Sequence, residues 1–140
     1  MAYQFKREPL TPAEADKLYQ SCNSVQEKLI IWVLLDTGLR VSELCSLRPQ
    51  NILWQQKSIR ISGKGGPYGK QTKNRVVPMS GRVQALLEHY FAINEKFPIG
   101  PRQVQKVVKE IANRAQISKT VTPHILRHTF ATLALSLIHI

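Results

Sequence analysis

The chain has 140 residues, of which 43% are hydrophobic and 21% are charged, a balance typical of a globular protein rather than a disordered one. A single domain of this length can bury about 68% of its unfolded surface, so one hydrophobic core is expected over residues 1–140. Twenty Lys and Arg residues face nine Asp and Glu residues, and the net charge of +11 favours a polyanionic partner, most often nucleic acid. The alternative is a basic surface that serves only solubility.

Local features exclude several classes of protein. The longest purely apolar run is the seven residues Leu29–Leu35, whereas a membrane span needs about 20. Residues 1–7 contain no apolar segment of a secretory signal. Two isolated cysteines, Cys22 and Cys45, are typical of small buried apolar residues in a reducing compartment rather than of a disulfide framework. The sequence therefore predicts a cytoplasmic protein with no membrane partner.

Capping signals and apolar spacing divide the first part of the chain into helices. Thr11 with Glu14 has the pattern of a capping box, and Ser24 repeats the signal before an apolar segment. Gly38 is a typical helix stop. The predictions are helices from the Thr11 cap to about Ser21, from the Ser24 cap to Gly38, and from Arg40 to Pro49.

The period of the apolar residues then changes from helical to alternating. Ser58–Ser62 alternates as a half-buried strand does, and Arg75–Pro78 is a second strand candidate. The segment between them, Gly63–Lys70, is rich in glycine and lysine. These features predict an antiparallel β-hairpin with a long basic tip.

Helical spacing returns in the remainder of the chain. The predicted helices run from about Arg82 to Ile93, from Pro101 through Ile111, and from the Thr122–Pro123 cap to about Leu137. The fold class predicted from the whole pattern is mainly α with a small antiparallel β-sheet, an α+β single domain over residues 1–140.

Positive charge is concentrated in the middle of the sequence. The first 43 residues hold five basic and six acidic residues, whereas no acidic residue lies between Glu43 and Glu88. Such a run can be an ordinary solvated face, and it becomes a track for phosphates only if the fold gathers it on one side. The basic residues of this stretch are Arg48, Lys57, Arg60, Lys64, Lys70, Lys73, Arg75 and Arg82.

Two common ligand motifs fail on spacing. The glycine-rich segment is not a Walker loop, because Lys64 stands where the first glycine before Gly69–Lys70 is required. It is not a dinucleotide fingerprint either, because Tyr68 occupies the third glycine position. His124 and His128 have the spacing of helical zinc ligands, but no Glu follows His124 and no acidic or Cys cluster stands nearby. No nucleotide, metal or other cofactor is expected.

The start of the last helix carries a pattern suited to an anion. His124 and Arg127 are three residues apart and share a helix face near free backbone N–H groups. Arginine can grip two phosphate oxygens, and histidine can transfer a proton near neutral pH. Arg40 opens another helix after Gly38, with Glu43 placed to pair with it or brace it. The alternatives are a surface arginine, a satisfied histidine and a plain helix-start salt bridge.

Four segments stand in a fixed order: Thr37–Leu44, Gly63–Gly65, Arg75–Pro78 and Thr122–Thr132. In this order and spacing they resemble the catalytic domain of the tyrosine recombinase, or phage integrase, family, over roughly residues 8 to 133. The resemblance implies the fold of that domain. It also implies cleavage and rejoining of DNA through attack of a tyrosine on a phosphodiester, without metal or nucleotide.

The resemblance assigns roles by position. Arg40 and Arg127 match the arginines that clamp the scissile phosphate, Lys64 matches the hairpin lysine that protonates the leaving 5′ oxygen, and His124 matches the histidine that assists proton transfer. Glu43 matches an acidic residue that supports the first arginine. Other contacts to the DNA backbone are expected from Lys57, Arg60, Lys70, Lys73, Arg75 and His128.

The sequence departs from the family pattern at both ends. The family's nucleophilic tyrosine follows the His-Arg helix, whereas all four tyrosines here precede it: Tyr3, Tyr19, Tyr68 and Tyr90. Many relatives also carry a separate N-terminal DNA-binding domain, and this chain begins where the catalytic domain begins. We therefore expect a partial catalytic domain that binds double-stranded DNA, has other recombinase protomers as candidate partners, and is inactive alone because it has no nucleophile.

Two other functions fit the same residues. One is a non-catalytic DNA-binding regulator or decoy derived from a recombinase, for which Arg127→Ala would cost little affinity because many backbone contacts remain. The other is a basic helical protein that acts on a different polyanion, and a salt titration against duplex DNA and heparin distinguishes it.

Overall fold

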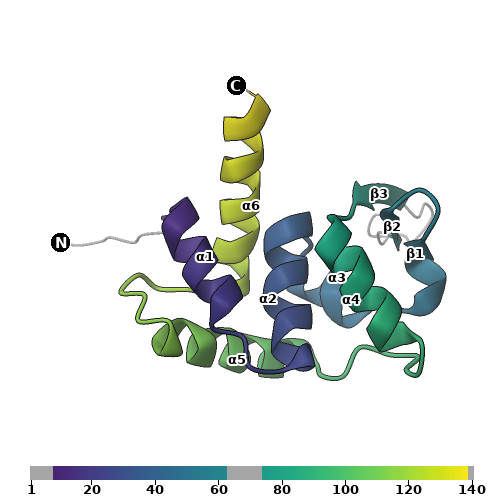
Figure 1. The fold of residues 1–140 in the computed structure, drawn as a ribbon, viewed down its shortest axis with the longest axis horizontal. Coiled ribbons are helices and arrows are strands. Elements are labelled where there is room, and N and C mark those ends of the chain that lie inside the picture. Colours follow the sequence, from purple (N-terminus) through teal and green to yellow (C-terminus); the bar gives the residue numbers. More distant parts are fainter. Residues whose placement is uncertain (1–7, 63–73, 139–140) are drawn as a thin grey trace, which may run out of the picture.

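The computed structural model describes residues 8–62 and 74–138, with side chains described up to residue 134. In this part of the chain, six α-helices and a 3₁₀ turn accompany three short strands (Figure 1). In chain order the elements are α1 (Pro12–Gln20), α2 (Val25–Thr37), α3 (Val41–Cys45), η1 (Pro49–Asn51), β1 (Ile52–Leu53), β2 (Ser58–Ser62), β3 (Asn74–Pro78), α4 (Gly81–Phe91), α5 (Pro101–Arg114) and α6 (Pro123–Ile138).

Helix α2 is the centre of the core. It is apolar on nearly every side, and a helix of this kind is stable only when other elements surround it. Helices α1, α3, α4, α5 and α6 all contact it. Figure 1 shows α6 beside α2, the sheet with α3 and α4 toward the opposite end, and α5 running beneath. The α2 residues with no exposed surface are Leu29, Ile30, Ile31, Val33 and Leu34.

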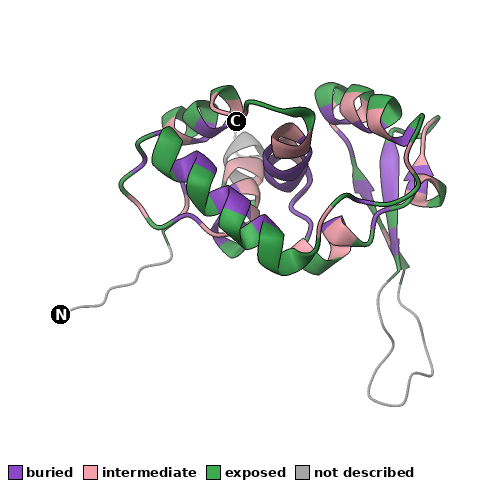
Figure 2. Ribbon diagram, turned by 90° about the horizontal axis from the view of Figure 1, so that it is seen from below, coloured by how far each residue is buried: buried purple, intermediate pink, exposed green. Residues whose placement is uncertain are grey.

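The predicted helix boundaries are confirmed where capping residues define them. The Thr11 side chain accepts a hydrogen bond from the Glu14 amide, and the Glu14 carboxylate accepts one from the Thr11 amide, which completes the capping box of α1. Ser24 caps α2, and Gly38 ends it in the left-handed conformation at φ 73°. Helix α5 buries Val104 and Ile111 on one face and exposes the opposite face to solvent (Figure 2).

The sheet contains one strand more than the hairpin predicted from sequence. Strands β2 and β3 pair antiparallel in the expected place, with Ile59 opposite Val77, and β1 adds to the other edge of β2. A strand of two residues is too short to show alternation, so no pattern revealed β1. The hairpin tip, residues 63–73, lies outside the described residues.

The third helix is shorter than the sequence predicted. It ends at Cys45, and the chain then makes the η1 turn at Pro49–Asn51 before entering β1. The Asn51 side chain accepts a hydrogen bond from the Arg48 amide at 2.9 Å. Arg48 itself is extended, with φ −137° and ψ 161°, as the residue before a proline prefers, so the helix has to end before Arg48.

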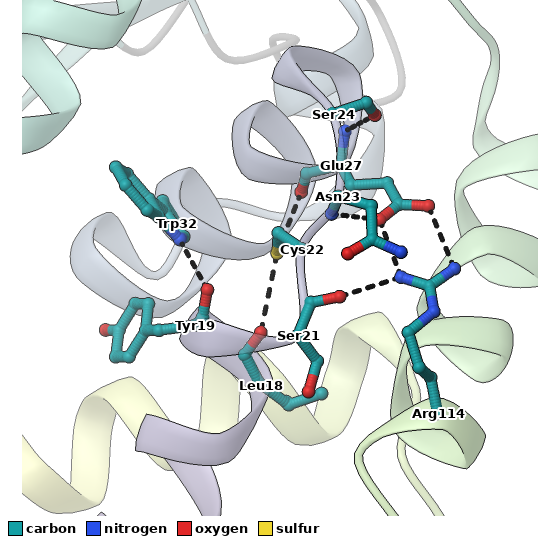
Figure 3. Close-up of polar contacts among 9 residues, drawn as sticks. All are labelled: Leu18, Tyr19, Ser21, Cys22, Asn23, Ser24, Glu27, Trp32 and Arg114. Atoms are coloured by element: carbon teal, nitrogen blue, oxygen red, sulfur yellow. Dashed lines mark hydrogen bonds and ion pairs between the residues drawn. The ribbon is translucent and has the colours of Figure 1, made fainter.

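Arg114 ties the end of α5 to the connection between α1 and α2 (Figure 3). Its Nη1 donates to the Ser21 carbonyl at 2.7 Å and to Glu27 Oε1 at 2.8 Å. In the same connection the Cys22 thiol contacts the Leu18 carbonyl, and burial raises the pKa of Cys22 to about 12. Cys22 and Cys45 are free thiols that pack against the core, but both are half-buried rather than buried as the sequence predicted.

Within residues 8–62 and 74–138, no helix has both the length and the apolar character that crossing a membrane requires.

Candidate functional site

The two arginines expected to grip a phosphate lie on elements that pack closely together. Arg40 follows Gly38 by two residues, and Arg127 precedes Phe130 by three residues on α6. A Cβ atom on Gly38 would lie 2.3 Å from Cδ2 of Phe130, so only glycine allows this approach of the two segments. The left-handed turn at Gly38 and the packing of α6 on α2 thus bring Arg40 and Arg127 near enough for the charge of Arg40 to act on Arg127.

The carboxylate of Glu43 is shared by two arginines at this site. Arg75 forms a two-pronged contact with it, Nη1 to Oε2 at 2.7 Å and Nη2 to Oε1 at 3.0 Å. Arg40 donates its backbone N–H to Oε1 at 2.9 Å, but its guanidinium reaches Oε2 only at 3.4 Å. Glu43 therefore holds the backbone of Arg40, while its main side-chain partner is Arg75.

The ionised form of Glu43 is strongly favoured. Burial opposes ionisation of this carboxyl, whose side chain is 13% exposed. The hydrogen bonds from Arg75 and from the Arg40 amide, together with the charges of both arginines, outweigh burial and lower the pKa of Glu43 to about 2. Glu43 is consequently a carboxylate at any physiological pH.

Arg127 has an unsatisfied donor and lies close enough for the charges of Arg40, Glu43 and Arg75 to act on it. Within the described residues, its Nη1 atom is buried and has no hydrogen-bond partner. Burial lowers the pKa of Arg127, the nearby charges of Arg40 and Arg75 lower it further, and Glu43 opposes them. A buried donor without an acceptor costs about 1–3 kcal/mol, so the site gains when an oxygen atom is placed there.

An open groove of about 840 Å³ is lined by Arg40, Glu43 and Arg75 and continues along the sheet. The side chain of Arg40 is 61% exposed at its edge. Asn51, Arg60 and Asn74 add further polar groups, and the rim carries small hydroxyl side chains. The hydroxyl residues are Ser42, Ser46 and Ser62. Cationic and neutral donors in an open groove suit an extended anion.

His124 lines a second groove of about 730 Å³ between α5 and the start of α6. Val41, the neighbour of Arg40, lines the same groove, so His124 lies on the flank of the arginine cluster rather than inside it. The His124 side chain is exposed at the first turn of α6. Gln105 and Lys109 of α5 contribute polar groups to this groove.

The other residues predicted to hold DNA are dispersed. Lys57 is exposed in the turn before β2 with φ 53°, and His128 is exposed on α6. The predictions for Lys64, Lys70 and Lys73 fall outside the described residues. In the ranges that the structure covers, no three His, Cys, Asp or Glu side chains gather in a way that could hold a metal ion.

Two of the four tyrosines are described, and both hydroxyls have partners away from the arginine cluster. Tyr19 donates to Asp36, which also accepts from Ser80 Oγ at 2.6 Å and Arg82 Nε at 2.8 Å. Burial and the Asp36 carboxylate raise the pKa of Tyr19. Tyr90 donates to the carbonyl of Lys96. The contacts of Asp36 hold α1, α2 and the start of α4 together.

A sequence profile of the phage integrase family matches residues 8–136. The chain belongs to this family. A tyrosine recombinase of Pseudothermotoga lettingae is 34% identical over 134 residues, which cover 88% of this chain and 45% of that protein. Tyrosine recombinase XerA of Pyrococcus horikoshii is 31% identical over 137 residues, which cover 88% of this chain and 46% of the relative. The chain thus spans less than half the length of these relatives.

Solved structures of phage integrases and tyrosine recombinases share the fold. The crystal structure of XerA recombinase has a TM-score of 0.78 at 29% identity, over 91% of this chain and 50% of that one. The integrase of mycobacterium phage Brujita has a TM-score of 0.80 at 20% identity, over 96% of this chain and 46% of that one, a likeness of fold alone. The fold expected from the resemblance is therefore confirmed.

Two contacts in this phage integrase domain were not predicted from sequence. The first is the two-pronged Arg75–Glu43 pair, because residues 32 positions apart carry no sequence signal of pairing. The second is the contact of Phe130 with Gly38. Gly38 was identified only as a helix stop, and its second role depends on which helix packs against it.

Proposed function

We propose that the arginine cluster binds the phosphodiester backbone of double-stranded DNA, and that the protein is the phosphate-gripping part of a site-specific recombinase. Solved relatives are described as a Tn1549 integrase in complex with circular intermediate DNA and as XerH recombinase bound to its difH substrate. Family membership and the +11 charge support carrying DNA binding over to this chain. A cytoplasmic location is part of this proposal, because it is consistent with a protein that acts on DNA.

The observation that carries the proposal is the excess of positive charge around one carboxylate. Arg40 and Arg75 contact Glu43, and Arg127 lies near enough for their charges to act on it, so three positive charges accompany one negative charge and two remain uncompensated. Arg40 is largely exposed, and the buried Nη1 of Arg127 lacks an acceptor among the described residues. A phosphate oxygen supplies both the charge and the acceptor.

A site of this kind can stabilise the transition state of phosphoryl transfer. Negative charge gathers on the nonbridging oxygens, and preset cations such as Arg40 and Arg127 stabilise it more than they stabilise the ground state. Loss of one clamp arginine is expected to cost on the order of 10²–10³ in rate. His124 is proposed to assist proton transfer from the flank of the cluster, and Lys64 to protonate the leaving 5′ oxygen.

We also propose that the polypeptide of these 140 residues forms no covalent adduct with DNA by itself. Tyr19 and Tyr90 have hydroxyls engaged elsewhere, and Tyr3 and Tyr68 do not match the nucleophile by position. Incubation with a nicked suicide duplex followed by a denaturing gel tests this point. A shifted covalent band would overturn it.

DNA binding is tested by fluorescence anisotropy with a short labelled duplex across a salt series. Each phosphate contact contributes about 0.9 to the slope of log affinity against log salt, so its loss lowers affinity about eightfold at about 0.1 M salt. Arg40→Ala and Arg127→Ala are each expected to show this loss. Lys17→Ala is the control, because Lys17 is exposed on α1 and lines neither groove.

The comparison is decisive because both kinds of variant remove one positive charge. If Lys17→Ala lowers the affinity and the salt slope as much as Arg40→Ala, binding follows net charge alone and the groove is not the site. If both arginine variants retain the wild-type affinity, the cluster does not touch the DNA backbone, and the proposal is wrong.

A further inference from the structure

We propose that Arg75 is a positioning residue that occupies Glu43 and thereby keeps the guanidinium of Arg40 free for phosphate. The sequence led us to expect that Arg75 would hold the DNA backbone directly. Its contacts assign it a different role, in which it acts on Arg40 through Glu43 and does not bind the phosphate itself. This inference rests on the proposed function for its consequence in DNA binding, and its structural half can be tested without DNA.

Arg75 and Arg40 compete for the same carboxylate. Arg75 presents two parallel N–H···O contacts of 2.7 and 3.0 Å, whereas the Arg40 side chain makes one contact of 3.4 Å. A planar fork on a carboxylate is the strongest arrangement available to such a pair. Arg75 is therefore the preferred partner, and 61% of the Arg40 side chain remains exposed in the groove.

Removal of Arg75 would leave Arg40 as the one residue of the described chain that still donates hydrogen bonds to the Glu43 carboxylate. The carboxylate is 13% exposed, and a charge with so little access to water requires a nearby cation. Arg40 already lies 3.4 Å away, and its backbone N–H is held by the same carboxylate. The Arg40 guanidinium would swing onto Glu43, and the site would lose the cation that faces solvent as well as Arg75 itself.

The pair also links two parts of the site that are distant in sequence. Arg75 is in β3, where it pairs in register with Ile61 of β2, and Glu43 is in α3. The side-chain contact is the polar tie between the base of the hairpin and the helix that Arg40 opens. It fixes the position of Arg40 relative to the sheet side of the groove.

A double-mutant cycle in the DNA-binding assay separates positioning from direct contact. Arg75→Ala is expected to lower affinity about eightfold at about 0.1 M salt, through the loss of Arg40. Addition of Glu43→Gln to Arg75→Ala should restore most of that loss, because a neutral amide no longer holds the Arg40 guanidinium. If Arg75 contacts DNA itself, Glu43→Gln gives no such rescue.

Arg60→Ala provides the matched background. Arg60 is an exposed arginine of β2 that lines the same groove, and it forms no salt bridge with Glu43. Glu43→Gln should improve affinity more in the Arg75→Ala background than in the Arg60→Ala background. Equal improvement in both would show that only net charge matters and would overturn the inference. Thermal melting of each variant identifies any loss of affinity that comes from unfolding.

The DNA-free measurement is NMR of the guanidinium N–H groups of Arg40 and Arg75. In the wild type, the Arg75 signals should be protected from solvent exchange and the Arg40 side-chain signals should exchange rapidly. In Arg75→Ala, the Arg40 signals should become protected. Unchanged rapid exchange of Arg40 would overturn the inference whatever happens to binding. Protection of Arg40 without any change in DNA affinity would instead overturn the proposed function.

Discussion

Replacement of Gly38 by alanine tests the contact that unites the site. The residue has φ 73°, a conformation that costs an alanine about 1–2 kcal/mol. The added Cβ would also lie 2.3 Å from Cδ2 of Phe130, a distance at which the ring must move. Overpacking of this kind typically costs 1–3 kcal/mol, so the expected loss in the free energy of unfolding is about 2–5 kcal/mol.

Urea denaturation of the wild type and of Gly38→Ala measures the loss. Gly81→Ala is the matched control, because Gly81 begins α4 and a Cβ there meets nothing within 4 Å. It should change stability by less than about 1 kcal/mol, and in the stabilising direction, since alanine restricts the unfolded chain.

A second variant separates backbone strain from the clash. Phe130→Ala combined with Gly38→Ala removes the clash and leaves only the strain at φ 73°. The double variant should therefore be less destabilised than the sum of the single variants, by about 1–3 kcal/mol. If Gly38→Ala is as stable as the wild type, or if the two effects simply add, the close packing of α6 on this turn is not what limits residue 38.

Three further predictions concern groups near the site. Thr129→Val should cost about 1–3 kcal/mol in urea denaturation, because the fully buried Thr129 hydroxyl accepts the Leu10 amide at 2.9 Å and valine leaves that donor unpaired; a cost below about 0.5 kcal/mol would contradict this. Asp36→Asn should cost about 1–3 kcal/mol, because the amide cannot accept both contacts from Arg82, and an unchanged melting temperature would refute it. The pKa of Glu43 is lowered from 4.5 to about 2, so its contribution is present above about pH 4.5 and is lost as the pH falls toward 2, a loss of about 3 kcal/mol. Denaturation across that range should show a shallower acid loss for Glu43→Gln, and equal slopes would refute the assignment.

Local signals in the sequence were sufficient for most of the secondary structure. The Thr11 and Ser24 caps and the Gly38 stop act within a few residues of themselves, so the helices they bound could be predicted directly. The alternation of Ser58–Ser62 was likewise visible. The strand Ile52–Leu53 was missed because it exists only through pairing with β2.

The candidate site likewise contains residues that local sequence signals identified and contacts that only the folded structure revealed. Arg40, His124 and Arg127 were identified from residue type and from order along the chain, since spacing within one motif is a local property. The pairing of Arg75 with Glu43 was not identified. Which arginine pairs with Glu43 depends on the distance between α3 and β3 in the folded chain. Only the fold sets that distance.

The sequence by itself determined the family, the order of helices and strands, and the residue types available to bind a phosphate. Each of these depends on residues that are close together in the chain. The tertiary structure decided how the charges are distributed among them. It paired Arg75 with Glu43, left Arg40 open to the groove, and buried one arm of Arg127 without an acceptor among the described residues. Those outcomes depend on the packing of α6 against the turn at Gly38 and of α3 against the sheet, which bring together groups more than 30 residues apart in the chain.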